Sequence, residues 1–208
     1  MATTCSQQHR TPQELVTELH GLRDVDWPTV WSGPPHPGQG LDMWSAQFDW
    51  VPTSFERVLQ VRTDTGATLT LNNVGGSWAP VTDVSHWLWG AGAETVEDNP
   101  SLLAEAAHVW PLYVTAASAV LGEPTWEGAW DAEDFPENLG NHDVGSRSYR
   151  LAQQNPHRLA YWMPTDASAP LVILEILLRA NTAARSPRPG AANLSVRFHP
   201  RPVENRGL

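Results

Sequence analysis

The stretch ERVLQVRTDTGATLTLNNV, residues 56–74, decides the fold class of this chain. Apolar and polar residues alternate on both sides of a central DTG, residues 64–66, as they do in strands that bury one face. Gly66 supplies the positive φ that a tight turn between two antiparallel strands requires. The stretch therefore predicts a β-hairpin, and with it an antiparallel sheet.

A second strand is predicted at LVILEILL, residues 171–178. Its apolar residues are continuous instead of alternating, which is typical of a strand covered on both faces. A helix is the alternative, but Val172, Ile173 and Ile176 favour the strand. The apolar run that contains it is too short to cross a membrane and carries Glu175.

Four further stretches are predicted to be strands. Residues 41–51, LDMWSAQFDWV, alternate imperfectly and predict a strand, or a strand followed by a turn. RSYRLAQ and RLAYWMP, residues 147–153 and 158–164, predict a second hairpin joined by QNPH. NLSVRFHP, residues 193–200, predicts a last edge strand, because Pro200 and Pro202 end it at once.

Helices are predicted at both sides of the first hairpin. TPQELVTELHGL, residues 11–22, has a capping box of Thr11 and Glu14. Residues 99–121 form the clearest helix, with Asn99 as its cap, Gly122 after its end and Pro111 predicted to kink or split it. Its predicted buried face is Leu103, Ala107, Trp110, Val114, Ala117 and Leu121. DVSHWLWGAG, residues 83–92, predicts a short helix closed by a glycine.

Together these elements predict an α+β fold, a mainly antiparallel sheet with helices packed on one face. The chain has 208 residues, enough for one domain with tails. We expect a flexible N-terminus over residues 1–10, a single α+β domain over residues 11–182, and an Arg/Pro-rich C-terminal segment over residues 183–208. That last segment is expected to be loosely held, apart from the candidate strand NLSVRF.

The composition limits the possible functions. Cys5 is the only cysteine, so an internal disulfide and a thiolate metal cluster are excluded. No signal peptide is visible, and we therefore expect a cytoplasmic protein. Residues 63–146 contain 13 acids and no lysine or arginine. Such a stretch argues against a nucleic-acid partner, whose phosphates need basic side chains, and favours a basic protein partner.

No motif identifies a reaction. The chain has no GxSxG nucleophile elbow and no phosphate-binding loop followed by lysine. NVGGSW, residues 73–78, lacks the third glycine and the helix of a dinucleotide site and is interpreted as a turn. His142 and Asp143, in NHD, are candidates for a metal or acid–base site, against the simpler interpretation of a polar loop. We therefore assign no catalytic residue, metal ligand or cofactor.

The segment GEPTWEGAWDAEDFPEN, residues 122–138, holds two tryptophans and six carboxylates and no positive charge. Paired carboxylates beside tryptophans suggest a glycosidase, but any acidic loop contains such pairs. We hypothesise a surface that receives a partner, with aromatic anchors and a ring of acids that steers a basic protein. In the structural alternative, the tryptophans pin this loop onto the sheet. The candidate partner-binding residues are Trp126, Trp130, Asp131, Glu133, Asp134 and Glu137.

Three stretches carry a resemblance. ELVTELHGLRDVDW, VLGEPTWEGAW and RLAYWM, followed by the apolar strand, are similar in layout to small Trp-rich actinobacterial proteins of unknown function. Families of this layout are found among candidate immunity proteins of polymorphic toxin systems. The resemblance covers roughly residues 12–180 and assigns no residue roles. The Pro/Gly-rich residues 31–40 and the Arg/Pro tail depart from it.

The sequence and the resemblance together predict a cytoplasmic, non-enzymatic binding protein, an immunity protein that neutralises a basic toxin domain through an acidic-aromatic surface. A chaperone or adaptor for a secreted protein is one alternative, and a small hydrolase of unrecognised type is the other. A flat acidic-aromatic face favours immunity, and an exposed apolar groove favours the chaperone. A deep pocket with converging histidine and acid groups favours the hydrolase. The oligomeric state is left open.

Overall fold

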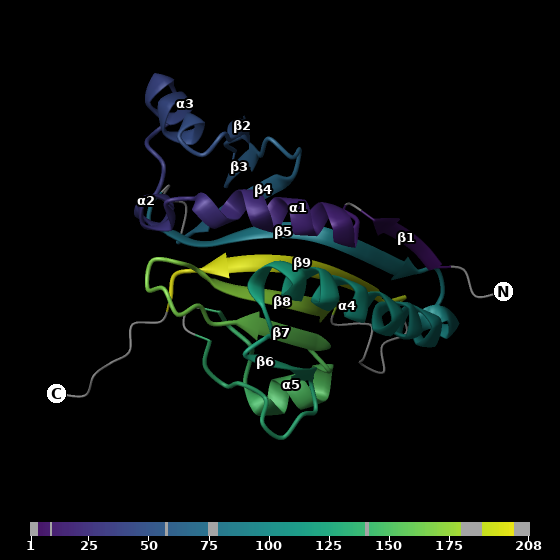
Figure 1. Ribbon diagram of the computed structural model, residues 1–208. Coiled ribbons are helices and arrows are strands. Elements are labelled where there is room, and N and C mark those ends of the chain that lie inside the picture. The colour runs from purple at the N-terminus through teal and green to yellow at the C-terminus, as the bar shows by residue number, and fades with distance from the viewer. Residues whose placement is uncertain are drawn as a thin grey trace.

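The computed structural model describes residues 4–8, 10–56, 58–74, 79–139, 142–179 and 189–201. Nine antiparallel strands form one sheet in the order β2-β3-β4-β5-β9-β8-β7-β6, and β1 also pairs with β5 (Figure 1). The strands are β1 Thr4–Gln8, β2 Val51–Ser54, β3 Leu59–Arg62, β4 Thr68–Asn73, β5 Val81–Ala93, β6 Trp126–Ala129, β7 Arg158–Trp162, β8 Leu171–Leu178 and β9 Ala191–His199. The α-helices are α1 Pro12–Gly21, α2 Trp27–Ser32, α3 Gln39–Ala46, α4 Asn99–Leu121 and α5 Arg147–Gln153. The predicted α+β fold with an antiparallel sheet is confirmed.

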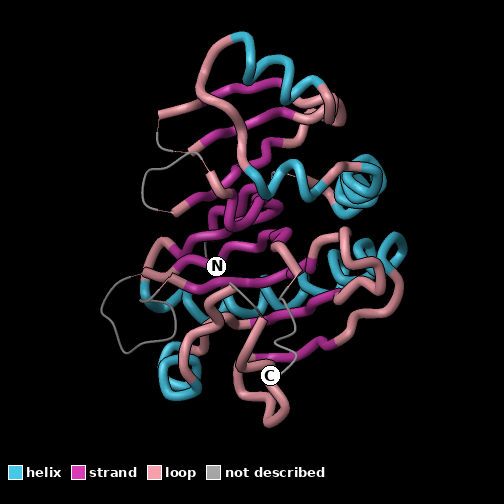
Figure 2. Tube along the Cα trace, turned by 90° about the vertical axis from the view of Figure 1, so that its left-hand side faces the viewer, coloured by secondary structure: helices cyan, strands magenta, loops and turns pink. Residues whose placement is uncertain are grey.

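Each face of the sheet carries an apolar core, and the two cores differ in size. Leu71, Leu174 and Leu194 belong to the main apolar core, together with residues of α1, α2 and α4 that cover this face. On the other face a smaller core forms around Leu159 and Ile173, and the segment from β6 to α5 covers it. In Figure 2, α1 and α5 accordingly lie on opposite sides of the sheet. Helices therefore cover both faces, but α1 and α4 lie on the face that carries the main apolar core.

The predicted hairpin is confirmed as β3 and β4, which pair from Leu59↔Leu71 to Arg62↔Thr68. Gly66 has φ of 82°, as the turn requires. Helix α1 has the predicted capping box, in which the Thr11 hydroxyl accepts from the Glu14 backbone N–H at 3.1 Å. The helix also contacts the hairpin turn, where the Thr63 hydroxyl donates to the Glu18 carboxylate at 3.0 Å.

Helix α4 runs unbroken for 23 residues with Pro111 inside it, so the helix is not split. Two details of the prediction are wrong. The cap is Asp98, while the Asn99 side chain accepts from the backbone of Gly190 at 2.8 Å. The buried face is also shifted from the predicted one, since α4 packs against the sheet and also against α1, which lies beside it on the same face. It consists of Asn99, Leu102, Ala106, Trp110, Tyr113, Val114, Ala116 and Ala117.

Two predicted elements have the opposite secondary structure. Residues 41–46 form the end of α3 because Leu41, Trp44 and Ser45 bury one helical face, and only Val51 begins a strand. Residues 83–92 belong to the 13-residue strand β5, not to a short helix. A bulge between Trp87 and Trp89 interrupts the alternation of β5, which is why the sequence resembles a helix there.

The predicted second hairpin is wrong in its first arm. Residues 147–153 form α5, whose N-cap Ser146 accepts from the Tyr149 backbone N–H at 3.3 Å. The helix ends at Gln154, which has φ of 52°. The second arm is β7, as predicted, but it pairs with β6 and β8. The N-cap serine outweighs the weak alternation of this stretch.

The predicted domain boundaries at residues 10 and 182 are also corrected. Residues Thr4–Gln8 pair with β5, so part of the N-terminal segment belongs to the sheet. Strand β9 lies between β5 and β8 in the middle of the sheet, not at its edge. Its even-numbered residues from Ala192 to Phe198 are buried, because both neighbouring strands and the helices enclose them. Residues 180–188 and 202–208 lie outside the described residues.

Candidate functional site

The acidic-aromatic segment begins at the end of α4 and forms β6, the edge strand next to β7. Trp126 is opposite Tyr161, and Gly128 is opposite Leu159. The chain then turns through Trp130–Glu137, where the Phe135 backbone N–H donates to Ala132 at 3.3 Å. We call residues 126–137 the acidic segment.

Trp126 holds this segment against the sheet. Its indole covers Gly128, where an added Cβ would lie 2.6 Å from two ring atoms. The indole Nε1–H donates to Asp134 at 3.1 Å, and the ring packs edge-on against Phe135 with 5.1 Å between centroids. Trp126 therefore makes the contacts expected of a tryptophan that pins this loop onto the sheet. It is half-buried, so only part of its surface is exposed.

Trp130 is half-buried as well, and α5 braces it from below. Its backbone carbonyl accepts from Arg150 Nε at 2.9 Å. The Arg150 guanidinium lies 4.0 Å from the centre of the Phe135 ring and is 2% exposed. Burial lowers the pKa of this guanidinium, while the charge of Glu137 acts in the opposite direction. Arg150 thus places one buried cation beneath the acidic segment.

The four predicted steering acids, Asp131, Glu133, Asp134 and Glu137, are all exposed. Within the described part of the chain, none of them forms an ion pair with an arginine, and Asp134 alone is engaged, by Trp126. The structure therefore presents four carboxylates on a turn whose backbone is braced from behind. Four exposed carboxylates on one turn make the local electrostatic potential negative.

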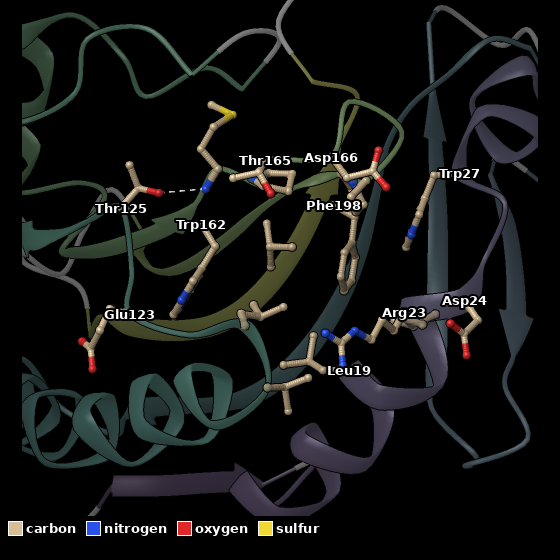
Figure 3. Close-up of a pocket in the computed structure, with 18 residues that line it drawn as sticks. Leu19, Arg23, Asp24, Trp27, Glu123, Thr125, Trp162, Thr165, Asp166 and Phe198 are labelled. Carbon is tan, nitrogen blue, oxygen red and sulfur yellow. Dashed lines mark hydrogen bonds between the residues drawn. The ribbon is translucent and has the colours of Figure 1, made fainter.

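A groove of about 600 Å³ lies beside the start of this segment, where α1, α2 and the end of α4 meet the β7–β8 loop (Figure 3). Trp27, Trp162 and Phe198 line it, with Trp27 and Trp162 on opposite sides, but each is only 2–4% exposed. Its half-buried apolar residues include Val120, Leu121 and Met163. Glu123 and Thr125, which directly precede the acidic segment, also line it. No local pattern in the sequence indicates this groove, because its lining comes from four separate parts of the chain: residues 19–27, 120–125, 162–172 and Phe198.

A buried polar chain crosses the other face of the sheet. Glu175 of β8 is 1% exposed and accepts from Arg197 Nε at 2.6 Å and from His142 Nε2 at 3.1 Å. Arg197 also reaches Asp83 at 3.4 Å, and Asn72 donates to Asp83 at 2.8 Å. Although burial alone would raise the pKa of Glu175, the hydrogen bond and charge of His142 and the charge of Arg197 hold it below its usual value.

Of the two residues of the NHD candidate that the structure describes, His142 joins a cluster of charges. Asp143 instead accepts from the Gly145 backbone at 2.8 Å, and Asn141 lies outside the described residues. His199 packs against His142 with 5.0 Å between ring centroids, and neither of its ring nitrogens has a hydrogen-bond partner among the described residues. Burial and the charge of His142 lower the pKa of His199 to about 4.

This polar chain is built like a structural brace. Each carboxylate in it already accepts from a neighbouring side chain, and none of its members lines the groove. Among the described residues, no three His, Cys, Asp or Glu side chains are arranged to hold a metal ion. Glu175 and Arg197 were visible in the sequence as single charges inside strands, but their pairing depends on the order of the strands.

No protein-family model matches the chain, and no curated protein or solved structure shows significant similarity to it. Among the helices that the structure describes, none combines the length and the apolar character needed to cross a membrane.

Proposed function

We propose that this chain is a non-enzymatic binding protein that docks a basic protein partner on its acidic segment. The observation that carries this proposal is the set of four exposed carboxylates without a cationic partner in the described chain, on a turn braced by Trp126, Phe135 and Arg150. A braced turn loses little conformational entropy on binding, so its charges contribute more to association. We propose no catalytic residue, metal or cofactor for this function.

The resemblance to candidate immunity proteins makes a basic toxin domain in the cytoplasm the proposed partner. A toxin that acts on nucleic acid has a basic surface, and an acidic inhibitor gains association rate and affinity by resembling the charge of that substrate. The 13 acids of residues 63–146, a stretch that contains no lysine or arginine, fit this role. It also opposes direct binding of nucleic acid.

The two alternatives receive different support. The groove beside α4 is the feature that a chaperone or adaptor would use, and it keeps that alternative open. The hydrolase receives less support, because the contact between a histidine and a carboxylate, His142 with Glu175, is buried and also held by Arg197. A catalytic pair would need to reach a substrate.

The proposal is tested by isolating the partner with the intact protein from its native cells and then measuring rates on the purified pair. The variant D131N/E133Q/D134N/E137Q removes four charges and keeps an acceptor for the Trp126 indole. We expect its association rate at low salt to fall about tenfold, with wild type and variant converging at roughly 1 M salt, where the Debye length is about 3 Å.

Matched changes at Glu94 and Glu97, two exposed acids near the other end of α4, serve as the control. E94Q/E97Q should leave the association rate nearly unchanged. A partner with an acidic docking surface, or equal rate losses in the two variants, would contradict the proposal.

A further inference from the structure

The groove is continuous with the acidic segment. Glu123 and Thr125 line the groove, and the next residue along the chain, Trp126, begins the segment. A partner that rests on the acidic segment therefore reaches the mouth of the groove without leaving the surface. The proposed function specifies only that the partner is basic, and the groove indicates which side chain of the partner binds beside the acidic segment.

The groove is held open by fixed walls. Trp27 stacks on Phe198 with 5.1 Å between centroids, and the Trp162 indole N–H donates to the Gly122 carbonyl at 2.8 Å. On the same side as Trp162, the Thr125 hydroxyl accepts from the backbone N–H of Met163 at 2.9 Å (Figure 3). These contacts fix the walls before any ligand arrives. A volume of about 600 Å³ accommodates a large side chain.

The polar groups at the mouth favour a cationic segment. Asp24 and Glu123 are exposed and have no hydrogen-bond or ion-pair partner among the described residues, whereas Asp166 is engaged by Ser168 at 2.8 Å. The Arg23 side chain extends into the groove (Figure 3) and likewise has no such partner there. A guanidinium offers five donors and no acceptor, so it suits the backbone carbonyl oxygens of a peptide.

We propose that this groove, with Val120, Leu121 and Met163 as its half-buried apolar surface, receives an aromatic side chain of the basic partner. Arginine or lysine residues on either side of that side chain face Asp24 and Glu123, and Arg23 donates to the backbone carbonyls beside it. The inference rests on the proposed function, because the partner is taken to be a basic protein. The charged rim sets the direction of approach, and the aromatic side chain resists dissociation.

The test uses three synthetic peptides and the full chain labelled with ¹⁵N. The first peptide is acetyl-Arg-Gly-Phe-Gly-Arg-amide, the second replaces Phe with Ala, and the third replaces both Arg residues with Glu. We expect the first peptide to shift the indole N–H signals of Trp27 and Trp162 together with the amide signal of Thr125. The Ala and Glu peptides should each bind at least about fivefold more weakly. The Ala peptide lacks the aromatic side chain, and the Glu peptide lacks the positive charges.

A matched pair of variants locates the site. Ala169 lines the groove, and Ala167 lies two residues earlier in the same loop and outside it. A169W should fill the groove and weaken the Phe peptide about tenfold or more, while A167W should bind it as wild type does. Equal melting temperatures and an unchanged spectrum away from the loop would show that both variants fold.

Equal binding of the Phe peptide by A169W and wild type would overturn the inference. So would equal or tighter binding of the Glu peptide, which would mean that the groove takes an apolar anion at Arg23. No binding of the Phe peptide at millimolar concentration would overturn it too. If D131N/E133Q/D134N/E137Q slows the native partner while A169W leaves that partner's affinity unchanged, the inference fails and the proposed function stands.

Discussion

The two faces of the sheet are stabilised in different ways, although the same strands supply both. In β8, Val172, Leu174 and Ile176 point into the main core, while Glu175 points to the opposite face, where it meets His142 and Arg197. Apolar contacts are many and each is replaceable, since dispersion and burial add up over neighbours. A buried charge depends on a particular partner, because removing one member leaves the other unsolvated. The comparison predicts that the polar face is the less tolerant of single changes.

The largest expected effect on stability comes from replacing Glu175, the carboxylate shared by His142 and Arg197. E175L leaves His142 without its acceptor and leaves Arg197 with Asp83 alone, at 3.4 Å. We expect the free energy of unfolding to fall by about 4 kcal/mol, measured by urea denaturation. The double variant E175L/R197L should recover part of this loss, because it also removes the unpaired cation. A larger loss in the double variant than in E175L would contradict this account.

Truncating the apolar face should cost less than breaking the polar one. Leu194 of β9 is fully buried between β5 and β8. L194A should lower the free energy of unfolding by about 3 kcal/mol, from lost burial and the cavity that remains. The same denaturation experiment measures it. The value also tests the central position of β9, because truncating a residue of a loosely held tail would leave stability nearly unchanged.

A change of pH probes the polar face without a mutation. Since the pKa of His199 is lowered to about 4 from its ordinary value near 6.5, the unfolded state takes up a proton that the folded state does not. The contribution of His199 to stability should therefore be fully present above about pH 6.5 and fall by about 3 kcal/mol as the pH drops to 4. H199Q should remove this part of the pH dependence. Parallel stability curves for the two proteins would contradict the assignment.

The smallest expected effect concerns the clasp of the acidic segment. W126A removes the ring from Gly128 and Phe135, so unfolding should become easier by about 2 kcal/mol, measured by thermal denaturation. D134N keeps an acceptor for the indole and should change stability by less than about 0.5 kcal/mol. If W126A leaves the melting temperature unchanged, Trp126 is a free anchor for the partner and not a clasp.

Much of the fold was predictable because many of its elements are determined by interactions within short segments of the chain. The positive φ at Gly66, the capping box of α1 and the apolar run of β8 depend on residues a few positions apart. One error arose from a neighbouring strand and the other from a local helix cap that outweighs the periodicity. The bulge in β5 broke the alternation of that strand, and Ser146 started a helix in a stretch that alternates. For the site, the sequence predicted an exposed acidic turn, and the structure places the four carboxylates on one.

The sequence by itself determined the antiparallel hairpin, the two long helices, the burial of β8 and the unbroken negative charge of residues 63–146. Only the tertiary structure decided that β9 occupies the middle of the sheet, that Trp126 holds its own segment, and that His142 meets Glu175 from 33 positions away. The physical reason is the separation along the chain over which each interaction acts. Turns, caps and periodicity act over a few residues, whereas the pairing of a buried charge and the walls of a groove depend on the order in which distant strands are assembled.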